Sequence, residues 1–195
     1  MKAKKLGSDK KELSVKEKLK QQGREEVILI PRHDVKSREV ESTEDIARVI
    51  EDGMKMVDQL RRPVGRWQSG YALAHSQITK KDPLRFFVTT KGDAIINPKI
   101  TWKPHENQAE PHNEGCYTFH SLEDRTVYVP RFEKIKAEWY ELMEDGKVSP
   151  KVTAELRGMQ AKVFQHEIDH MDGIYIYDKQ TTSAPKLGKN GKFKR

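Results

Sequence analysis

The sequence predicts an α+β fold in which antiparallel sheets surround a central helix that carries metal ligands. Within residues 125–142, apolar and polar residues alternate over several stretches, which is the period of strands with one buried face. Glu-Asp-Gly-Lys at residues 144–147 follows and is typical of a hairpin turn. The string Gln-His-Glu-Ile-Asp-His at residues 165–170 has the spacing of a helix-borne metal site. Together, these features favour sheets packed around one functional helix.

Length and charge predict one domain with two basic extensions. A chain of 195 residues is long enough to bury a full core. Residues 1–26 carry nine Lys/Arg against five Asp/Glu, and residues 179–195 carry six Lys/Arg and no acid. We therefore expect a flexible basic extension at 1–26, a catalytic domain at 27–178 and a disordered basic tail at 179–195. A role of these extensions in contacting RNA or the ribosome stays an alternative, since basic tails follow phosphate backbones.

The composition also bounds the compartment and the partners. A single cysteine excludes an intramolecular disulfide framework and fits a reducing compartment. The sequence contains no apolar run long enough to span a bilayer, and its N-terminus lacks the apolar core of a signal peptide. We expect a cytoplasmic protein, a monomer, with no membrane partner.

Residues 43–60 have the clearest helical pattern. Ser42 or Thr43 can cap this helix, and acidic residues follow in its first turn. A proline and a glycine at residues 63 and 65 mark its end. One face carries the residues at helical spacing, Ile46, Val49, Ile50, Gly53, Val57 and Leu60.

Several shorter segments are predicted to be strands. The apolar run at residues 27–30 is one, and residues 84–90 and 94–97 flank a Lys-Gly-Asp turn. Pro98 and Pro104 are expected to break up the run that follows, and residues 105–110 to form a loop. Residues 174–177, Ile-Tyr-Ile-Tyr, are expected to form a closing strand.

A second helix is expected to begin at Ser149 and Pro150, with Thr153 as an alternative cap. Asp172 and Gly173 mark its end. Its apolar residues share broadly one side with the metal-ligand candidates, so the ligands should face the core. These apolar residues are Leu156, Met159, Val163, Phe164 and Met171.

The metal-ligand candidates are His166, His170 and Cys116. With about 3.6 residues per turn, a spacing of four places both imidazoles on one helix face. Glu167 adjoins the first ligand, where its carboxylate can take a proton from a water molecule at the metal. No His or Glu follows His170, and upstream Cys116, the only cysteine, is the candidate for a third ligand. A thiolate and two imidazoles leave a fourth position open for water.

Simpler interpretations exist for each of these residues. A His-Glu-x-x-His string also occurs by chance on surface helices, and a lone cysteine is usually a small core residue. His105 and His112 could bind metal in principle, but neither is paired at a ligand spacing. We prefer solvent-facing or pocket-lining roles for these two histidines.

Three motifs in order resemble those of the peptide deformylase family, which are written G-x-G-x-A-A-x-Q, E-G-C-x-S and Q-H-E-x-D-H. Here they read Gly-Tyr-Ala-Leu-Ala-His-Ser-Gln at 70–77, Glu-Gly-Cys-Tyr-Thr at 114–118 and Gln-His-Glu-Ile-Asp-His at 165–170. The resemblance covers roughly residues 27–178. It implies a hydrolase that removes the formyl group from the N-terminal formylmethionine of new polypeptides and releases formate. The implied cofactor is one divalent ion, Fe(II), with Ni(II), Co(II) or Zn(II) as alternatives.

The same resemblance assigns roles to individual residues. Cys116, His166 and His170 would hold the metal, and Glu167 would transfer protons. The side-chain amide of Gln77 and the backbone N–H of Tyr117 would stabilise the oxyanion. Glu114 and Arg131 would form an ion pair that braces the cysteine loop, and Asp169 would accept a hydrogen bond outside the metal ligands. The implied substrate-binding residues are Gly70, Tyr71, Ala72, His112, Glu114, Gly115, Met159 and Val163.

This sequence departs from the family pattern at five positions. Ala72 replaces the second glycine, so either its backbone is not left-handed or the loop is shifted. His75 replaces the second alanine and is expected to pack or to face solvent, with a polar role at the metal as the alternative. Tyr117, Thr118 and Lys162 replace Leu, Ser and an apolar residue, which bears on peptide preference.

Two other functions stay open at this point. One is a different metallohydrolase, such as a peptidase, that uses the same helix. The other is a deformylase-like protein with an altered substrate range or a non-catalytic binder of nascent chains or ribosomes. The altered first motif leaves room for the second, whereas the cysteine ligand argues against the first.

Overall fold

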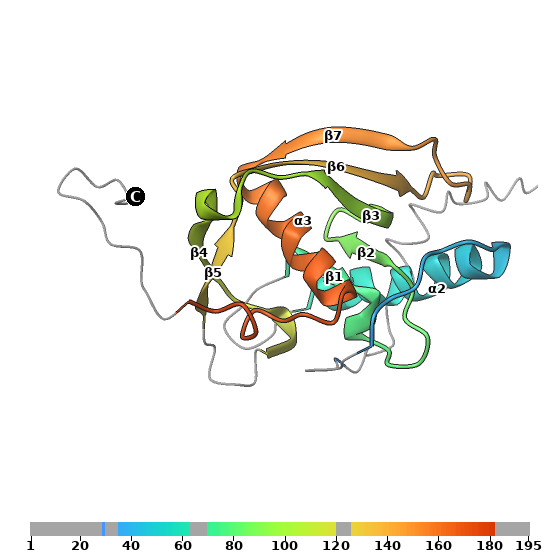
Figure 1. Cartoon of the computed structure of the whole chain (residues 1–195). Helices are drawn as coiled ribbons and strands as arrows, with labels where there is room; N and C mark the ends of the chain where they lie inside the picture. The colour runs from blue at the N-terminus through green and yellow to red at the C-terminus, as the bar shows by residue number, and fades with distance from the viewer. Residues whose placement is uncertain (1–28, 30–34, 63–69, 120–125, 182–195) are drawn as a thin grey trace, which may run out of the picture.

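The computed structural model describes residues 29, 35–62, 70–119 and 126–181. A five-stranded sheet has the order β1-β2-β3-β6-β7, and β4 and β5 form a separate two-stranded sheet. Helix α3 lies between the two sheets, and α2 packs beside β1 and β2 (Figure 1). The expected class, antiparallel sheets around a central helix, is confirmed. The strands are β1 (Ala72–Ala74), β2 (Phe86–Thr89), β3 (Ala94–Trp102), β4 (Glu110–Glu114), β5 (Val127–Arg131), β6 (Lys134–Glu141) and β7 (Val152–Arg157), and the helices are α2 (Thr43–Leu60) and α3 (Gly158–Met171).

Helix α2 has the bounds that its apolar period predicts. Ser42 is the N-cap, and its hydroxyl accepts a hydrogen bond from the Asp45 N–H at 3.1 Å. The Asp45 carboxylate in turn accepts from the Ser42 N–H at 3.3 Å, which completes a capping box. The buried face packs into a core with β2 and the first part of β3. That face consists of Val49, Gly53, Met56, Val57 and Leu60.

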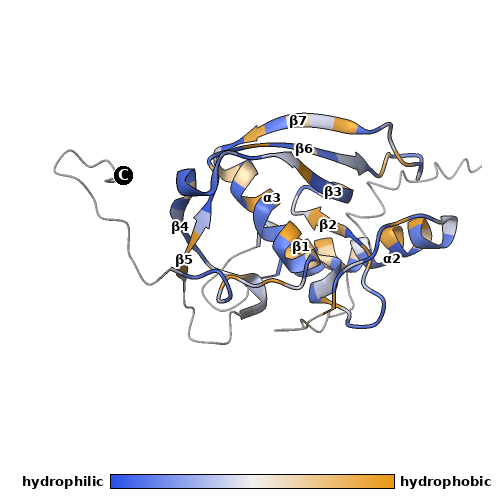
Figure 2. Cartoon of the chain, viewed as in Figure 1, coloured by the Kyte–Doolittle hydropathy of each residue, from blue (hydrophilic) through white to orange (hydrophobic). Residues whose placement is uncertain are grey.

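All pairings within both sheets are antiparallel, as predicted. Hydrophobic and hydrophilic residues alternate along β6 and β7 (Figure 2), and the hydrophobic ones on β6, Ile135, Ala137 and Trp139, are buried. The predicted turn joins these strands, with Gly146 at φ 81° and its N–H donating to the Met143 carbonyl. The hairpin therefore places one face of the sheet against α3.

Strand β3 is longer than the sequence suggested. It continues through Pro98 to Trp102 because Asn97 adopts φ 49° and the register with β6 shifts between Ile96 and Lys99. Such a bulge lets a strand absorb a proline, which has no N–H for the ladder. The loop expected at 105–110 contains a short 3-10 helix, η2 (Glu106–Gln108), and its last residue begins β4.

Two secondary-structure predictions near the C-terminus were wrong. No helix begins at Ser149 and Pro150: residues 152–157 form β7, paired with β6, so Leu156 lies in a strand. Helix α3 begins instead at Gly158, whose φ of 58° turns the chain out of the sheet. Residues 174–177 form no closing strand: 174 and 175 are irregular and 176–178 form a turn, although Tyr175 and Ile176 are buried. The predicted helix end is confirmed, because Asp172 is the C-cap and Gly173 has φ 74°.

Some predictions fall outside the described residues. The strand expected at 27–30 is one, apart from Leu29, and the extension at 1–26 and most of the tail at 179–195 are others. Among the helices that the structure describes, none combines the length and the apolar character that crossing a membrane requires.

Candidate active site

Helix α3 and the loop after β4 bring the three predicted metal ligands together. The Cys116 Sγ lies 3.3 Å from the His170 Nε2, which lies 3.1 Å from the His166 Nε2. One ligand atom from each residue falls within 4.8 Å of the others. Cys116 and His170 are buried, and His166 is partly buried. One thiol and two imidazole nitrogens that converge on one point fit a divalent transition metal.

The other ring nitrogen of His166 is held by Glu114, at 3.0 Å between Nδ1 and Oε2. A carboxylate in this position keeps the proton on Nδ1 and leaves the Nε2 lone pair for a metal. Burial raises the pKa of Glu114, but the hydrogen bonds from His166 and Arg131 outweigh it and lower the pKa to about 2. Glu114 is therefore ionised at neutral pH.

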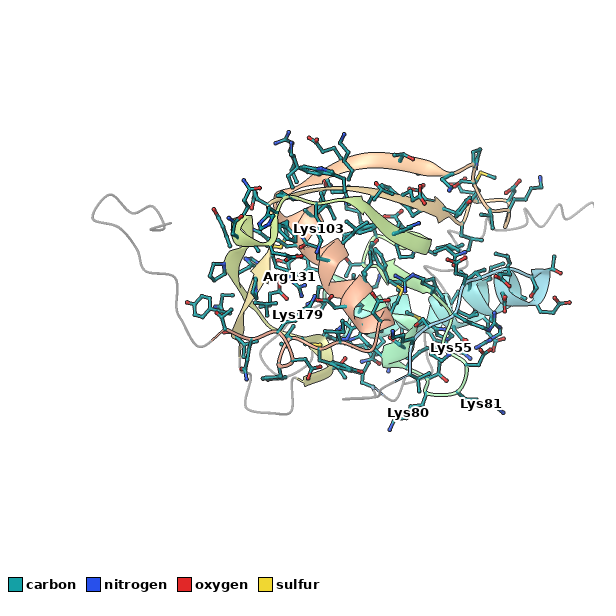
Figure 3. All side chains as sticks on the ribbon, viewed as in Figure 1. Lys55, Lys80, Lys81, Lys103, Arg131 and Lys179 are labelled. Carbon is teal, nitrogen blue, oxygen red and sulfur yellow. The ribbon has the colours of Figure 1, made fainter. Side chains whose placement is uncertain are left out.

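Arg131 braces this arrangement from inside the protein, and the predicted ion pair with Glu114 is present and buried. Its Nε and Nη2 donate to the two carboxylate oxygens of Glu114 at 2.7 and 2.9 Å. Its Nη1 donates to Asp169 at 2.5 Å, and the ammonium of Lys179 donates to the other Asp169 oxygen at 2.6 Å. Figure 3 shows Arg131 and Lys179 beside α3. Two carboxylates thus face two cations next to a predicted metal ligand.

Glu167 is buried and lines a pocket beside this cluster. Its Oε2 has no hydrogen-bond partner among the described residues. Burial raises its pKa to about 7; the charge on His166 opposes the rise, and the charge on Glu114 adds to it. A carboxyl group with such a pKa can accept and release a proton near neutral pH.

Gln77 approaches the same centre from η1 (His75–Gln77). Its Oε1 accepts a hydrogen bond from the Ala74 N–H at 2.8 Å, which fixes the side chain. Its Nε2 donates to the Thr118 hydroxyl and lies 3.9 Å from the Cys116 Sγ. The amide thus faces the cysteine, with Thr118 at the position where the family motif has serine.

The side chain of Tyr117 links the site to α2, a contact that the sequence did not reveal. Its hydroxyl donates to the Gln59 carbonyl at 2.6 Å, near the C-terminal end of that helix. Its ring also lies against Gly70, where a Cβ would meet the ring at 3.3 Å and Leu60 at 2.6 Å. Only glycine fits here without displacing Leu60 or Tyr117. Burial raises the pKa of the Tyr117 phenol, which keeps it protonated at neutral pH.

A pocket of about 210 Å³ opens beside the ligands. All eight predicted substrate-binding residues line it, and so does Lys162. Asn113 is a further lining residue that the sequence did not single out, because nothing in its local context distinguishes it. The complete lining is Gly70, Tyr71, Ala72, His112, Asn113, Glu114, Gly115, Tyr117, Met159, Lys162, Val163, His166 and Glu167.

The two departures in the first motif have structural explanations. Ala72 lies in β1, and among the described non-glycine residues only Asp82 and Asn97 have positive φ, so its backbone is not left-handed. His75 is 1% exposed and packs on Phe86, with ring centroids 4.7 Å apart. It lies outside the cluster of metal-ligand candidates. The expectation that His75 packs is confirmed.

A helix with His-Glu-x-x-His, a cysteine from a neighbouring loop and an adjoining pocket define a class of metal-dependent hydrolase site. The family model described as polypeptide deformylase matches residues 21–186, so the chain belongs to that family. Several proteins similar to this chain bear the name peptide deformylase.

A peptide deformylase from Ligilactobacillus salivarius is 40% identical over 93 residues, which are 47% of this chain and 45% of the relative. One from a Thermotoga species is 31% identical over 134 residues, which are 64% of this chain and 74% of the relative. The crystal structure of a Thermus thermophilus peptide deformylase has a TM-score of 0.58 at 29% identity, covering 80% of this chain and 86% of that one. The chain spans less than half the length of the Ligilactobacillus relative.

Proposed function

We propose that this protein removes the formyl group from the N-terminal formylmethionine of newly made polypeptides and releases formate. The observation that carries the proposal is the convergence of Cys116, His166 and His170 beside a pocket whose lining includes His166 and Glu167. Membership of the deformylase family supports it. A deformylase-like protein with an altered substrate range is the alternative, favoured by the polar residues in the pocket wall.

Cys116, His166 and His170 would hold one divalent ion, and we propose Fe(II). Ni(II), Co(II) and Zn(II) also suit a donor set of one thiolate and two imidazoles. When bound, the ion would supply Lewis-acid chemistry: it would polarise the formyl carbonyl and lower the pKa of a water molecule to near neutrality.

Glu167 is proposed to move the proton. Its carboxylate takes a proton from the attacking water, whose oxygen forms a bond with the formyl carbon. The same carboxyl group then gives this proton to the amine nitrogen as the carbon–nitrogen bond breaks. The products are formate and a peptide with a free N-terminus. The pKa of about 7 allows Glu167 to do both at neutral pH.

Gln77 and Tyr117 are proposed to stabilise the negative charge on the carbonyl oxygen. The Gln77 amide is fixed through the Ala74 N–H, so it needs little reorganisation when charge develops. The backbone N–H of Tyr117 would be the second donor. The methionine side chain would occupy the pocket lined by His112, Met159 and Val163.

The setting of this activity completes the proposal. The partners are nascent formyl-peptides, the compartment is the cytoplasm, and the protein acts as a monomer. The parts at 1–26, 27–178 and 179–195 remain the proposed division, with contact of the basic ends with the ribosome as an alternative to simple solvation.

Formate release from formyl-Met-Ala-Ser tests the function, with protein loaded with Fe(II) or Ni(II) without oxygen. Replacing Glu167 by alanine should lower turnover by about 10²- to 10⁴-fold, because the proton carrier is lost. The variant should still bind one metal ion, since its ligands are intact. Metal binding without formate release by the wild type would refute the activity and leave the fold assignment standing.

A further inference from the structure

Lys162 introduces a cation into the wall of the pocket. It precedes His166 by one helical turn on α3, so both side chains face the pocket with Met159 and Val163. The Lys162 side chain is only 22% exposed. Its stem therefore forms part of the wall, and its ammonium group lies at the edge.

The ion pair between Lys162 and Glu133 is weak. The ammonium lies 2.9 Å from a carboxylate oxygen of Glu133, which follows β5 and is 62% exposed. Ion pairs with so exposed a partner contribute little stability, because water competes for both charges. A carboxylate that enters through the pocket can therefore displace Glu133 at small cost.

The charge of Lys162 reaches across the pocket to β4. His112, which also lines the pocket, has a pKa below its ordinary value, mainly through burial and next through the charge of Lys162. Arg131, the other nearby cation, is held by Glu114 and Asp169. Lys162 is thus the cation of the pocket lining that a ligand can reach most directly.

The position of the pocket determines which part of a substrate meets this cation. Its lining includes His166 and Glu167, so it begins at the reacting centre. The side chain nearest the formyl group is that of the first residue. That side chain therefore enters the pocket and passes Lys162.

We propose that Lys162 is a specificity-determining residue that favours an acidic first side chain over a neutral one of equal size. The substrate class then extends from formylmethionine to formyl-peptides that begin with glutamate. This inference rests on the proposed deformylase activity.

The test compares kcat/KM for formyl-Glu-Ala-Ser and formyl-Gln-Ala-Ser, with formyl-Met-Ala-Ser as the reference substrate. Lys162→Met keeps the length of the stem and removes the charge, so the Glu/Gln ratio should fall by about tenfold. Glu133→Gln removes the competing carboxylate at nearly constant size, so the same ratio should rise. Opposite changes in these two variants are not expected from a general loss of structure.

Lys151→Met is the matched control, because Lys151 pairs with Glu138 at 3.5 Å outside this pocket. Its Glu/Gln ratio should equal that of the wild type. The inference is overturned if Lys162→Met leaves the ratio unchanged or alters all three substrates by one common factor. Absence of turnover even with formyl-Met-Ala-Ser would instead refute the proposed function itself, which separates the two failures.

Discussion

Two buried histidines of this protein have the same exposure and opposite chemistry. His75 and His170 are each 1% exposed, and the hydroxyl of Ser76, the neighbour of His75 in sequence, donates to the His170 carbonyl at 3.0 Å. In His75, Nδ1 accepts a hydrogen bond from the Leu84 N–H at 2.9 Å, and Nε2 faces the Asp52 carboxylate at 3.2 Å. Both ring nitrogens therefore have protein partners.

His170 turns its Nε2 toward the thiol of Cys116 and the Nε2 of His166. Three atoms that bind metals through lone pairs are thus directed at one another, which costs energy unless a cation or a proton lies between them. The difference teaches that burial and residue type do not define a metal site. Convergence of donor atoms on one point does.

Replacing each histidine by asparagine should give the largest difference between the two, and this difference should appear in metal binding. His170→Asn removes one of the three proposed ligands, so metal affinity should fall by more than the roughly 10- to 100-fold typical of losing an outer partner, and turnover should be lost. His75→Asn should retain metal. Metal content after dialysis and competition with a chelator measure both. Equal loss of metal in the two variants would contradict the distinction.

Arg131→Met should have the next largest effect, because it leaves Glu114 and Asp169 without their shared cation. Breaking a buried ion pair in this way costs about 3–5 kcal/mol of unfolding free energy at neutral pH. The pKa of Glu114 is lowered in the folded protein, so its contribution is present above its unfolded pKa of 4.5. That contribution is lost as the pH falls toward about 2. The difference in unfolding free energy between wild type and variant should therefore become smaller over this range.

Urea denaturation at a series of pH values measures this difference in unfolding free energy between the wild type and Arg131→Met. Arg157→Met is a suitable control, because Arg157 pairs with Glu155 on the surface and should change the stability little. A difference that stays constant down to pH 2 would show that ionised Glu114 does not need Arg131.

Local signals predicted those parts of the molecule whose structure depends on neighbours in sequence. The cap at Ser42 and the apolar period predicted both ends of α2 correctly. The spacing of His166 and His170 predicted that both lie on one face of α3. The three motifs predicted the cluster of candidate metal ligands, whose members lie far apart in the chain. The Glu114–Arg131 pair was predicted from the resemblance of residues 128–131 to another family segment.

The prediction of where α3 begins was wrong because a local helix-start signal conflicted with strand pairing. Ser149 and Pro150 form a good helix start, but the Ser149 hydroxyl accepts from the Glu141 N–H at 2.9 Å and belongs to the hairpin. Residues 152–157 gain a full ladder of hydrogen bonds with β6, which outweighs the local preference. The contacts of Lys179 with Asp169 and of Tyr117 with Gln59 have no local signal, since tertiary structure alone brings these residues together.

The smallest expected effect concerns His75. His75→Phe keeps a ring against Phe86 but leaves the buried Leu84 N–H without its acceptor and Asp52 without its partner. The loss of one buried hydrogen bond predicts a destabilisation of about 1–3 kcal/mol, measured by urea denaturation. Asp52→Asn should cost less, because its amide oxygen can still accept from His75. Both variants should bind metal as the wild type does. His75 lies outside the cluster of candidate metal ligands. Loss of metal from His75→Phe would therefore mean that His75 supports these residues through Ser76.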